Sequence, residues 1–214
     1  MSNGIKVKKR NGRGTESLNL EKMHKMVEEA TKGIAGVSAS QVEIQSGIQF
    51  YDGITTAEIQ EILIKSASDL IDLDHPNYQF VAARLLLFSI RKSLYGRTRE
   101  LPHLEEHIIK TVNQEVYDAG IYDKYSKEDI EKANGYIDHD RDFLFTYAGL
   151  RQVVDKYLVQ DRSTGQVYET PQFMYMMIAL TIFAEYPKET RLNYVRRYYN
   201  AISRHRINIP TPIM

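Results

Sequence analysis

The sequence predicts a mainly α protein of two parts, in which a short β-hairpin and four helices precede a second helical region. Apolar residues recur at helical spacing through most of the 214 residues, and strand-like alternation is confined to short stretches. A chain of this length with 43% hydrophobic residues buries about 70% of its unfolded surface. We place the two parts at residues 1–96 and 97–214.

Charge and cysteine content exclude several classes of function. The 28 basic and 28 acidic side chains cancel, which argues against a nucleic-acid or membrane-surface partner. Without cysteine the chain holds no disulfide, no thiolate metal site and no cysteine nucleophile. No apolar run approaches the ~18 residues of a membrane-spanning helix, and no signal sequence opens the chain. We therefore expect a cytoplasmic protein.

The first element is a predicted hairpin. Residues 5–10 alternate apolar and basic side chains, residues 11–14 (Asn-Gly-Arg-Gly) form a turn cluster, and residues 15–18 can return as a second strand. An isolated two-stranded hairpin is marginally stable, so it must pack on the helices that follow.

Four helices follow the hairpin. Asn19 is a good N-cap for the first, and residues 38–41 have the capping-box form that begins a short second helix. A second capping box at residues 55–58 begins the third. The fourth, at about residues 77–94, is apolar around most of its circumference, as is typical of a helix at the centre of its domain. Basic clusters at residues 9–10 and 91–92 can converge on one anion.

The second part is also mainly helical. Ser126 is predicted to cap one helix, and residues 141–159 are predicted to form another. A small hairpin is expected at residues 159–168, with its turn at Thr164 and Gly165. Two further helices are expected after Pro171 and Pro187, the first from about 172 to 184 and the second to about 204.

The first part resembles the ATP-cone, a nucleotide-sensing domain of ribonucleotide reductases. The resemblance rests on residues 7–12, 16–22, 52–56, 78–84 and 91–92. It implies that ATP or dATP binds as an allosteric effector, with Mg²⁺ held through the phosphates. The implied contact residues are Lys9, Arg10, Glu16, Ser17, Leu18, Asn19, Leu20, Glu21, Lys22, Thr56 and Lys92. Lysine ammonium groups suit phosphate oxygens, and backbone groups at a helix entry add donors.

One position departs from the family pattern. Relatives that dATP inhibits usually carry a histidine one turn after the threonine of the third helix, and this chain has Gln60. Glutamine cannot become cationic, so a phosphate contact there would lack charge assistance. We expect nucleotide binding to persist and discrimination between ATP and dATP to weaken.

The second part resembles the N-terminal helical region of the class I ribonucleoside-diphosphate reductase large (α) subunit. Four motifs carry the resemblance, at residues 141–149, 156–160, 164–173 and 209–214, and together with the first part they cover the whole chain in collinear order. The resemblance implies an oxidoreductase that converts ribonucleoside diphosphates to deoxyribonucleoside diphosphates for DNA synthesis. Its radical cofactor, a diiron centre or similar, would belong to a small (β) subunit. Thr211 matches a residue that contacts the substrate diphosphate.

The family's catalytic cysteines lie beyond the matching region, so we expect no catalytic residue in this chain. Its residues 210–212 match the segment that enters the first strand of the family's catalytic barrel. The sequence is interpreted as the N-terminal part of a split or truncated large subunit, whose partners are a C-terminal piece and the small subunit. A homo-oligomer is left open. Two alternatives are a stand-alone ATP/dATP-sensing module and a structural remnant without nucleotide binding.

Four other patterns favour structural interpretations. Residues 103–107 (His-Leu-Glu-Glu-His) match the pattern of a zinc peptidase, but a polar helix face is the favoured interpretation. The alternating charges of residues 138–142 are expected to pair with one another and to cap the next helix rather than to bind a metal. Methionines at residues 174, 176 and 177 and the Tyr198–Tyr199 pair are expected to pack in the core.

Overall fold

The computed structural model describes residues 5–9 and 14–207 and divides into two compact units. The first unit comprises the described residues up to Ser89 together with 145–151, and the second comprises 90–144 and the described residues from Gln152 onward. The predicted boundary at residue 96 differs from this division and stays a prediction. None of the helices in the described ranges is long and apolar enough to cross a membrane.

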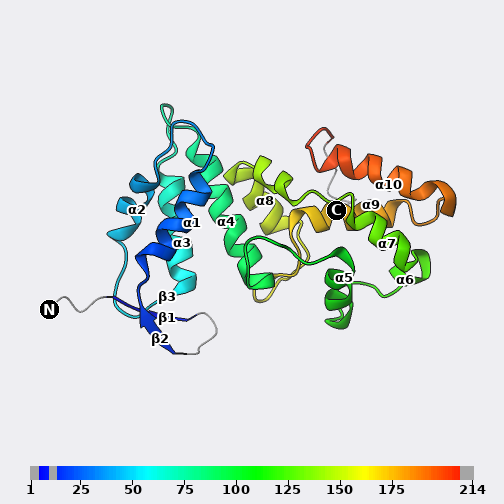
Figure 1. Cartoon of the computed structure of the whole chain (residues 1–214), viewed down its shortest axis with the longest axis horizontal. Helices are drawn as coiled ribbons and strands as arrows, with labels where there is room; N and C mark the ends of the chain where they lie inside the picture. The colour runs from blue at the N-terminus through cyan, green and yellow to red at the C-terminus, as the bar shows by residue number, and fades with distance from the viewer. Residues whose placement is uncertain (1–4, 10–13, 208–214) are drawn as a thin grey trace. The chain divides into compact units, whose positions relative to one another are not determined.

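The first unit consists of a small sheet and helices (Figure 1). Its strands are β1 (Lys6–Lys8), β2 (Thr15–Ser17) and β3 (Ile54–Thr55). Its helices are α1 (Leu20–Thr31), α2 (Ala39–Gly47), α3 (Thr56–Asp69) and the greater part of α4 (Tyr78–Tyr95). The hairpin and the four predicted helices are therefore confirmed.

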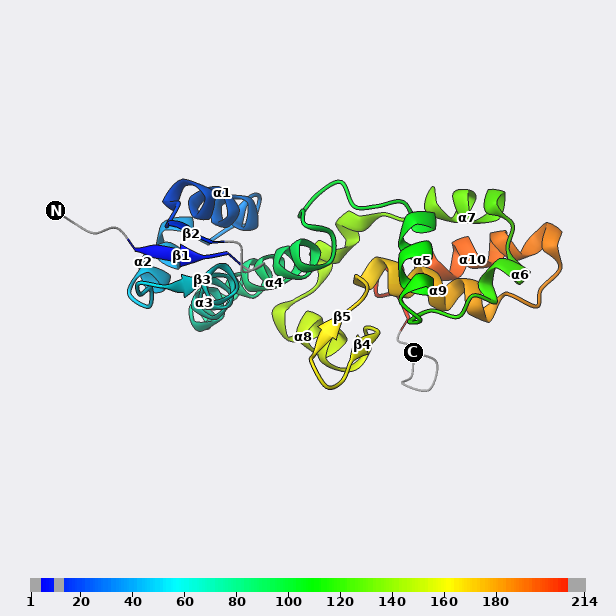
Figure 2. The same ribbon diagram turned by 90° about the horizontal axis from the view of Figure 1, so that it is seen from below.

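The predicted hairpin has a third strand that the sequence did not indicate. β1 lies between β2, with which it pairs antiparallel, and β3, with which it pairs parallel (Figure 2). β3 has only two residues, too few to show an alternating pattern. Its Ile54 is fully buried and pairs with the buried Val7 of β1, so the sheet is fixed to the apolar interior at this pair.

Local capping signals decide where two of the helices begin. The Asn19 side chain accepts a hydrogen bond from the Lys22 N–H at 2.9 Å, and Thr55 and Glu58 form a reciprocal capping box. The box predicted at Ser38 is absent. The Ser38 N–H instead donates to the buried Tyr78 hydroxyl at 3.0 Å, and that hydroxyl donates to the Gln41 side chain. Hydrogen bonds to the Tyr78 hydroxyl of α4 have thus replaced the local capping box between Ser38 and Gln41.

The core of the first unit is apolar and is drawn from every helix and from β1 and β3. Its most buried members include Val7, Val27, Ala30, Val42, Ile54, Leu63, Ala67, Val81 and Ala82. The Arg84 guanidinium of α4 donates to the Ala30 and Lys32 carbonyls, at 3.2 and 2.7 Å, at the C-terminal end of α1. These bonds satisfy carbonyls that have no partner within the helix.

The second unit is built mainly from short helices. They are the end of α4, α5 (Leu104–Asn113), α6 (Ile121–Lys124), α7 (Lys127–Asn134), the 3₁₀ helix η1 (His139–Leu144), the end of α8 (Tyr147–Lys156), α9 (Pro171–Ile182) and α10 (Lys188–Ile202). The predicted hairpin is confirmed as β4 (Gln160–Asp161) and β5 (Gln166–Val167). Helices α9 and α10 run side by side (Figures 1 and 2). Ser126 caps α7 through a capping box with Asp129, as expected.

The single helix predicted for residues 141–159 is wrong. The chain forms η1 as far as Leu144 and begins α8 anew at Tyr147. The Thr146 hydroxyl accepts a hydrogen bond from the Gly149 N–H at 3.2 Å, which starts a new helix at this point. Upstream, the buried Asp142 is held by partners outside η1.

A buried polar network connects four helices of the second unit. The Arg91 guanidinium donates to the Asp142 carboxylate at 2.9 Å, and the two side chains are 3% and 0% exposed. The second Asp142 oxygen accepts from the Gln172 amide at 2.9 Å, and the Gln172 carbonyl accepts from the Tyr199 hydroxyl at 2.7 Å. That hydroxyl in turn accepts from the Asp138 N–H at 2.9 Å. The network therefore joins α4, η1, α9 and α10.

The buried ion pair predicts an asymmetric response to mutation. We expect Arg91→Met to lower the free energy of unfolding by about 3–5 kcal/mol, because it leaves the Asp142 charge buried without its partner. Adding Asp142→Leu should recover part of that loss, because no uncompensated charge then remains. Urea unfolding followed by tyrosine fluorescence measures both variants. A double variant that is less stable than Arg91→Met would contradict this account.

Candidate nucleotide-binding site

One edge of the three-stranded sheet gathers part of the predicted nucleotide site. β1 and β3 are parallel, with Val7 opposite Ile54 and Lys8 opposite Thr55. The residues that follow the two strands, Lys9 and Thr56, therefore lie at the same edge. Thr56 is also the first residue of α3, so the N-terminus of that helix and its partial positive charge lie there too. A lysine beside a helix N-terminus favours an anion.

The charge of Lys9 is balanced by a carboxylate from the neighbouring strand. The Lys9 Nζ and Glu16 Oε2 atoms are 3.1 Å apart, with the two side chains 45% and 42% exposed. An ion pair this exposed contributes ~1 kcal/mol or less to stability. A phosphate can therefore take the place of the Glu16 carboxylate beside Lys9 at little cost.

The start of α3 is already well ordered. The Glu58 carboxylate accepts hydrogen bonds from the Thr55 N–H at 2.8 Å and from the Tyr51 hydroxyl at 2.8 Å. These bonds, first among them those from Thr55, hold the pKa of Glu58 below its usual value. Thr55 serves as the cap of the helix, and the half-buried Thr56 stands next to it. The role of Thr56 as a nucleotide ligand stays a prediction.

The rest of the predicted segment lies at the opposite edge of the sheet. Strand β2 runs antiparallel to β1, so Leu18 follows the end that is remote from Lys9, and its N–H donates to the Ile5 carbonyl at 2.8 Å. Asn19 caps α1, and Glu21 in the first turn pairs with Lys25 at 2.6 Å. At about 3.3 Å per residue, a three-residue strand separates the two edges by about 10 Å. A ligand that contacts both edges must be extended.

The sequence also assigns Arg10, Arg91, Lys92 and Thr211 to anion or substrate binding. Arg10 and Thr211 lie outside the described residues. Lys92 is exposed on the last turn of α4, and its assignment to the site stays a prediction. The expectation that Arg91 would help to bind the anion is wrong, because its guanidinium is buried on Asp142 and also donates to the His139 carbonyl at 2.7 Å.

Gln60, the position that departs from the family pattern, points into the first unit. Its side chain is 5% exposed. The Gln60 carbonyl accepts from the Ser89 hydroxyl at 3.4 Å, and the Gln60 amide lies 3.8 Å from the Met26 sulfur. The amide thus sits in an interior of low charge between α1, α3 and α4, where a cationic side chain would lose hydration.

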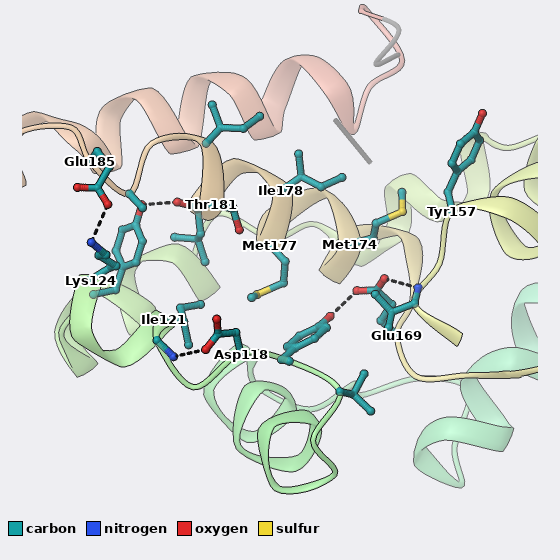
Figure 3. A pocket seen from close by; sticks show the side chains of 18 residues that line it. Asp118, Ile121, Lys124, Tyr157, Glu169, Met174, Met177, Ile178, Thr181 and Glu185 are labelled. Atoms are coloured by element: carbon teal, nitrogen blue, oxygen red, sulfur yellow. Dashed lines mark hydrogen bonds and ion pairs between the residues drawn. The ribbon is translucent and has the colours of Figure 1, made fainter. Parts of the chain in front are cut away.

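The second unit contains a cavity that the sequence did not indicate. It has a volume of about 610 Å³ and is lined by methionine and aliphatic side chains of α9 and by residues 116–125 (Figure 3). Met174 and Met176 are buried as expected, but the half-buried Met177 faces this cavity. The carboxyl group of Glu169 reaches the cavity wall, where it accepts from the Val159 N–H at 2.8 Å and from the Tyr117 hydroxyl.

The two histidines of the pattern at residues 103–107 lie in different environments, one at the surface and one in the interior. His103 is exposed at the start of α5, whereas His107 is 1% exposed and stacks on Phe173, with ring centroids 4.2 Å apart. The prediction that this pattern forms a polar helix face is therefore wrong for His107. Burial lowers the pKa of His107 to about 3, and its Nε2 atom lies 3.2 Å from the Tyr117 hydroxyl.

The charges of residues 138–142 separate in a similar way. Asp138 pairs with Arg141 at 3.2 Å, as expected, but Asp142 turns inward to Arg91 and does not cap α8. Tyr199 is fully buried, which confirms its expected packing role.

Two family models match the chain, one for each part. The ATP cone domain matches residues 5–93, and the ribonucleotide reductase, all-alpha domain matches residues 143–214. The first unit, with its small sheet and helices, is therefore an ATP cone, a class of nucleotide-binding regulatory domain.

Curated relatives extend this assignment to the whole chain. All 214 residues align at 48% identity with ribonucleoside-diphosphate reductase 1 subunit alpha of Escherichia coli K12, and at 47% with subunit alpha of Haemophilus influenzae. The alpha subunit of Enterobacteria phage T4 is 41% identical over 202 residues, or 94% of this chain. The chain spans 28% of the length of the first two proteins and 26% of the third. It is homologous to the N-terminal region of the ribonucleoside-diphosphate reductase alpha subunit.

The buried Glu169 predicts a pH dependence of stability. Burial raises its pKa from 4.5 to about 7, so the folded protein holds this proton more tightly than the unfolded chain does. The stability that this group contributes is complete below pH 4.5, falls as the pH rises to about 7, and then levels off. The whole decrease is about 3 kcal/mol.

Urea unfolding of wild type and of Glu169→Gln across pH 4–8 isolates this contribution, because the variant lacks the titrating group. The difference in unfolding free energy between the two proteins should change between pH 4.5 and 7 and be constant above that range. Parallel stability curves over the whole range would contradict a raised pKa.

Proposed function

We propose that the first unit binds ATP or dATP as an allosteric effector of a ribonucleoside-diphosphate reductase. The observation that carries the proposal is the parallel pairing of β1 and β3, which brings the residues after these strands, Lys9 and Thr56, to the edge of the sheet where α3 begins. A triphosphate at this edge replaces Glu16 as the partner of Lys9, and Mg²⁺ accompanies it through the phosphate oxygens.

The remaining contacts follow from the resemblance and from the extent of the sheet. Residues 16–22 run from Glu16, the partner of Lys9, to the opposite edge of the sheet, so they provide contacts along an extended nucleotide. The resemblance also implies Arg10 and Lys92 as phosphate-binding cations.

Reduction of ribonucleoside diphosphates to deoxyribonucleoside diphosphates is the proposed activity of the assembled enzyme. The relatives carry the name of this reductase and are several times longer than the present 214 residues, which contain no cysteine. We assign the thiol chemistry to the C-terminal part of the large subunit and the radical cofactor to the small (β) subunit. Thr211 is proposed to contact the substrate diphosphate, and the assembly is proposed to be cytoplasmic.

The effector site predicts a loss of nucleotide affinity when its lysine is removed. Lys9→Ala should weaken ATP binding by about 1.5–3 kcal/mol, or roughly 10- to 150-fold, the range for a hydrogen bond to a charged group. Isothermal titration of the chain with ATP and Mg²⁺ measures this change. Lys65→Ala is the matched control, because Lys65 is exposed on α3 but lies outside the predicted site. Equal affinities of the Lys9 and Lys65 variants would exclude the site.

The neutral side chain at residue 60 predicts weak discrimination between effectors. We expect ATP and dATP to bind this chain with affinities that differ by less than about tenfold, or 1.4 kcal/mol, because Gln60 adds no charge near the ligand. Titration with each nucleotide in turn gives the ratio. A larger preference for dATP would show that discrimination does not depend on a cation at residue 60. No binding of either nucleotide to the folded chain would favour a structural remnant.

A further inference from the structure

A basic cleft of about 680 Å³ lies in the second unit, outside the site proposed above. One wall is the segment 135–138 that follows α7, together with Arg141 of η1. The other wall is one face of α10 and the turn after it. On that wall Arg196, Asn200 and Arg204 follow one another at intervals of four residues, and Arg197 lies beside them. Residues four apart are neighbours on a helix face.

The charges in this cleft are poorly compensated. Four arginines line it, and Asp138 is the one acidic residue among the lining side chains. Arg196, Arg197 and Arg204 are exposed, and none of them forms an ion pair with a residue in the described parts of the chain. Like charges at helical spacing repel one another. An anion in the cleft would remove this repulsion.

Two of the arginines are held in place before any ligand arrives. The Arg141 guanidinium donates to Asp138 through Nε at 3.2 Å and to the buried Ser203 hydroxyl through Nη1 at 2.6 Å. It also lies 5.2 Å from the centre of the Tyr199 ring. These bonds use two of its five N–H groups, and its side chain is only 10% exposed. Arg196 is similarly placed over the Tyr136 ring, at 5.4 Å.

We propose that this cleft binds the diphosphate group of a small phosphorylated molecule. Arginine guanidinium groups match the spacing of phosphate oxygens and bind them through paired hydrogen bonds. A cleft of this volume suits a small molecule. The zero net charge of the chain argues against a long polyanion, which would require a basic excess. The proposal does not rest on the function of the first unit, because the two sites share no residue.

Titration calorimetry with inorganic pyrophosphate tests the proposal on the 214-residue chain carrying Lys9→Ala, which weakens the site of the first unit. In that background, Arg197→Gln with Arg204→Gln should reduce pyrophosphate affinity by at least about tenfold. Both arginines are exposed, so the folded structure should persist, which circular dichroism checks. Lys188→Gln is the matched control, because Lys188 is exposed at the other end of α10 and outside the cleft.

The outcomes separate the two phosphate sites. Pyrophosphate binding that survives Lys9→Ala and is lost in the double arginine variant supports the cleft. Binding that is lost with Lys9→Ala alone, or that is unchanged by the arginine substitutions, overturns it, as does the absence of binding. ADP is then titrated in the same background. Tighter binding of ADP than of pyrophosphate supports a nucleotide as the ligand, and equal binding supports recognition of the diphosphate alone.

Discussion

The ion pair between Arg91 and Asp142 is the interaction on which the second unit depends most. Each of these charges would be costly to bury alone, and each is accommodated because the other lies 2.9 Å away in the interior. Asp142 then orients Gln172, and Gln172 orients Tyr199. Because hydrogen bonds have narrow geometric limits, this sequence of contacts fixes four helices more specifically than apolar packing alone would. Arg141 continues this set of contacts, because its guanidinium donates to the Ser203 hydroxyl and lies over the Tyr199 ring.

The first unit follows a different principle, in which apolar packing supports a surface rich in charge. The buried pair of Val7 and Ile54 holds β1 against β3, while the neighbouring Lys8 and Lys9 are exposed. The buried pair therefore fixes the backbone of β1 and β3 to the core, and the exposed lysines at that edge can exchange partners. This arrangement suits a regulatory domain, since a ligand can change the surface contacts without disrupting the core. The homology to the alpha subunit agrees with such a role.

Sequence reasoning succeeded where the determining contacts are local. The caps at Asn19, Thr55 and Ser126 each depend on a residue three positions ahead, so the pattern alone reveals them. It failed where a distant residue decides. The Ser38 N–H donates to the hydroxyl of Tyr78, 40 residues away, so the expected local capping box does not form. Arg91 has the sequence pattern of a surface cation, but its guanidinium binds Asp142, 51 residues away. The residues proposed for the nucleotide site came from the family resemblance and stay a prediction, whereas the third strand, which brings the ends of β1 and β3 to one edge, was not predicted.

The position of β1 in the middle of the sheet has a consequence for synthesis of the protein. β2 and β3 do not pair with each other, so both depend on a strand that leaves the ribosome before either of them. Val7 can pair with Ile54 only after Ile54 has been translated, on the order of seconds later at about 5–20 residues per second. Until then β1 has at most one of its two neighbours, and a lone hairpin is only marginally stable. The nascent domain therefore completes the proposed effector-binding edge only after the chain has been made as far as α3.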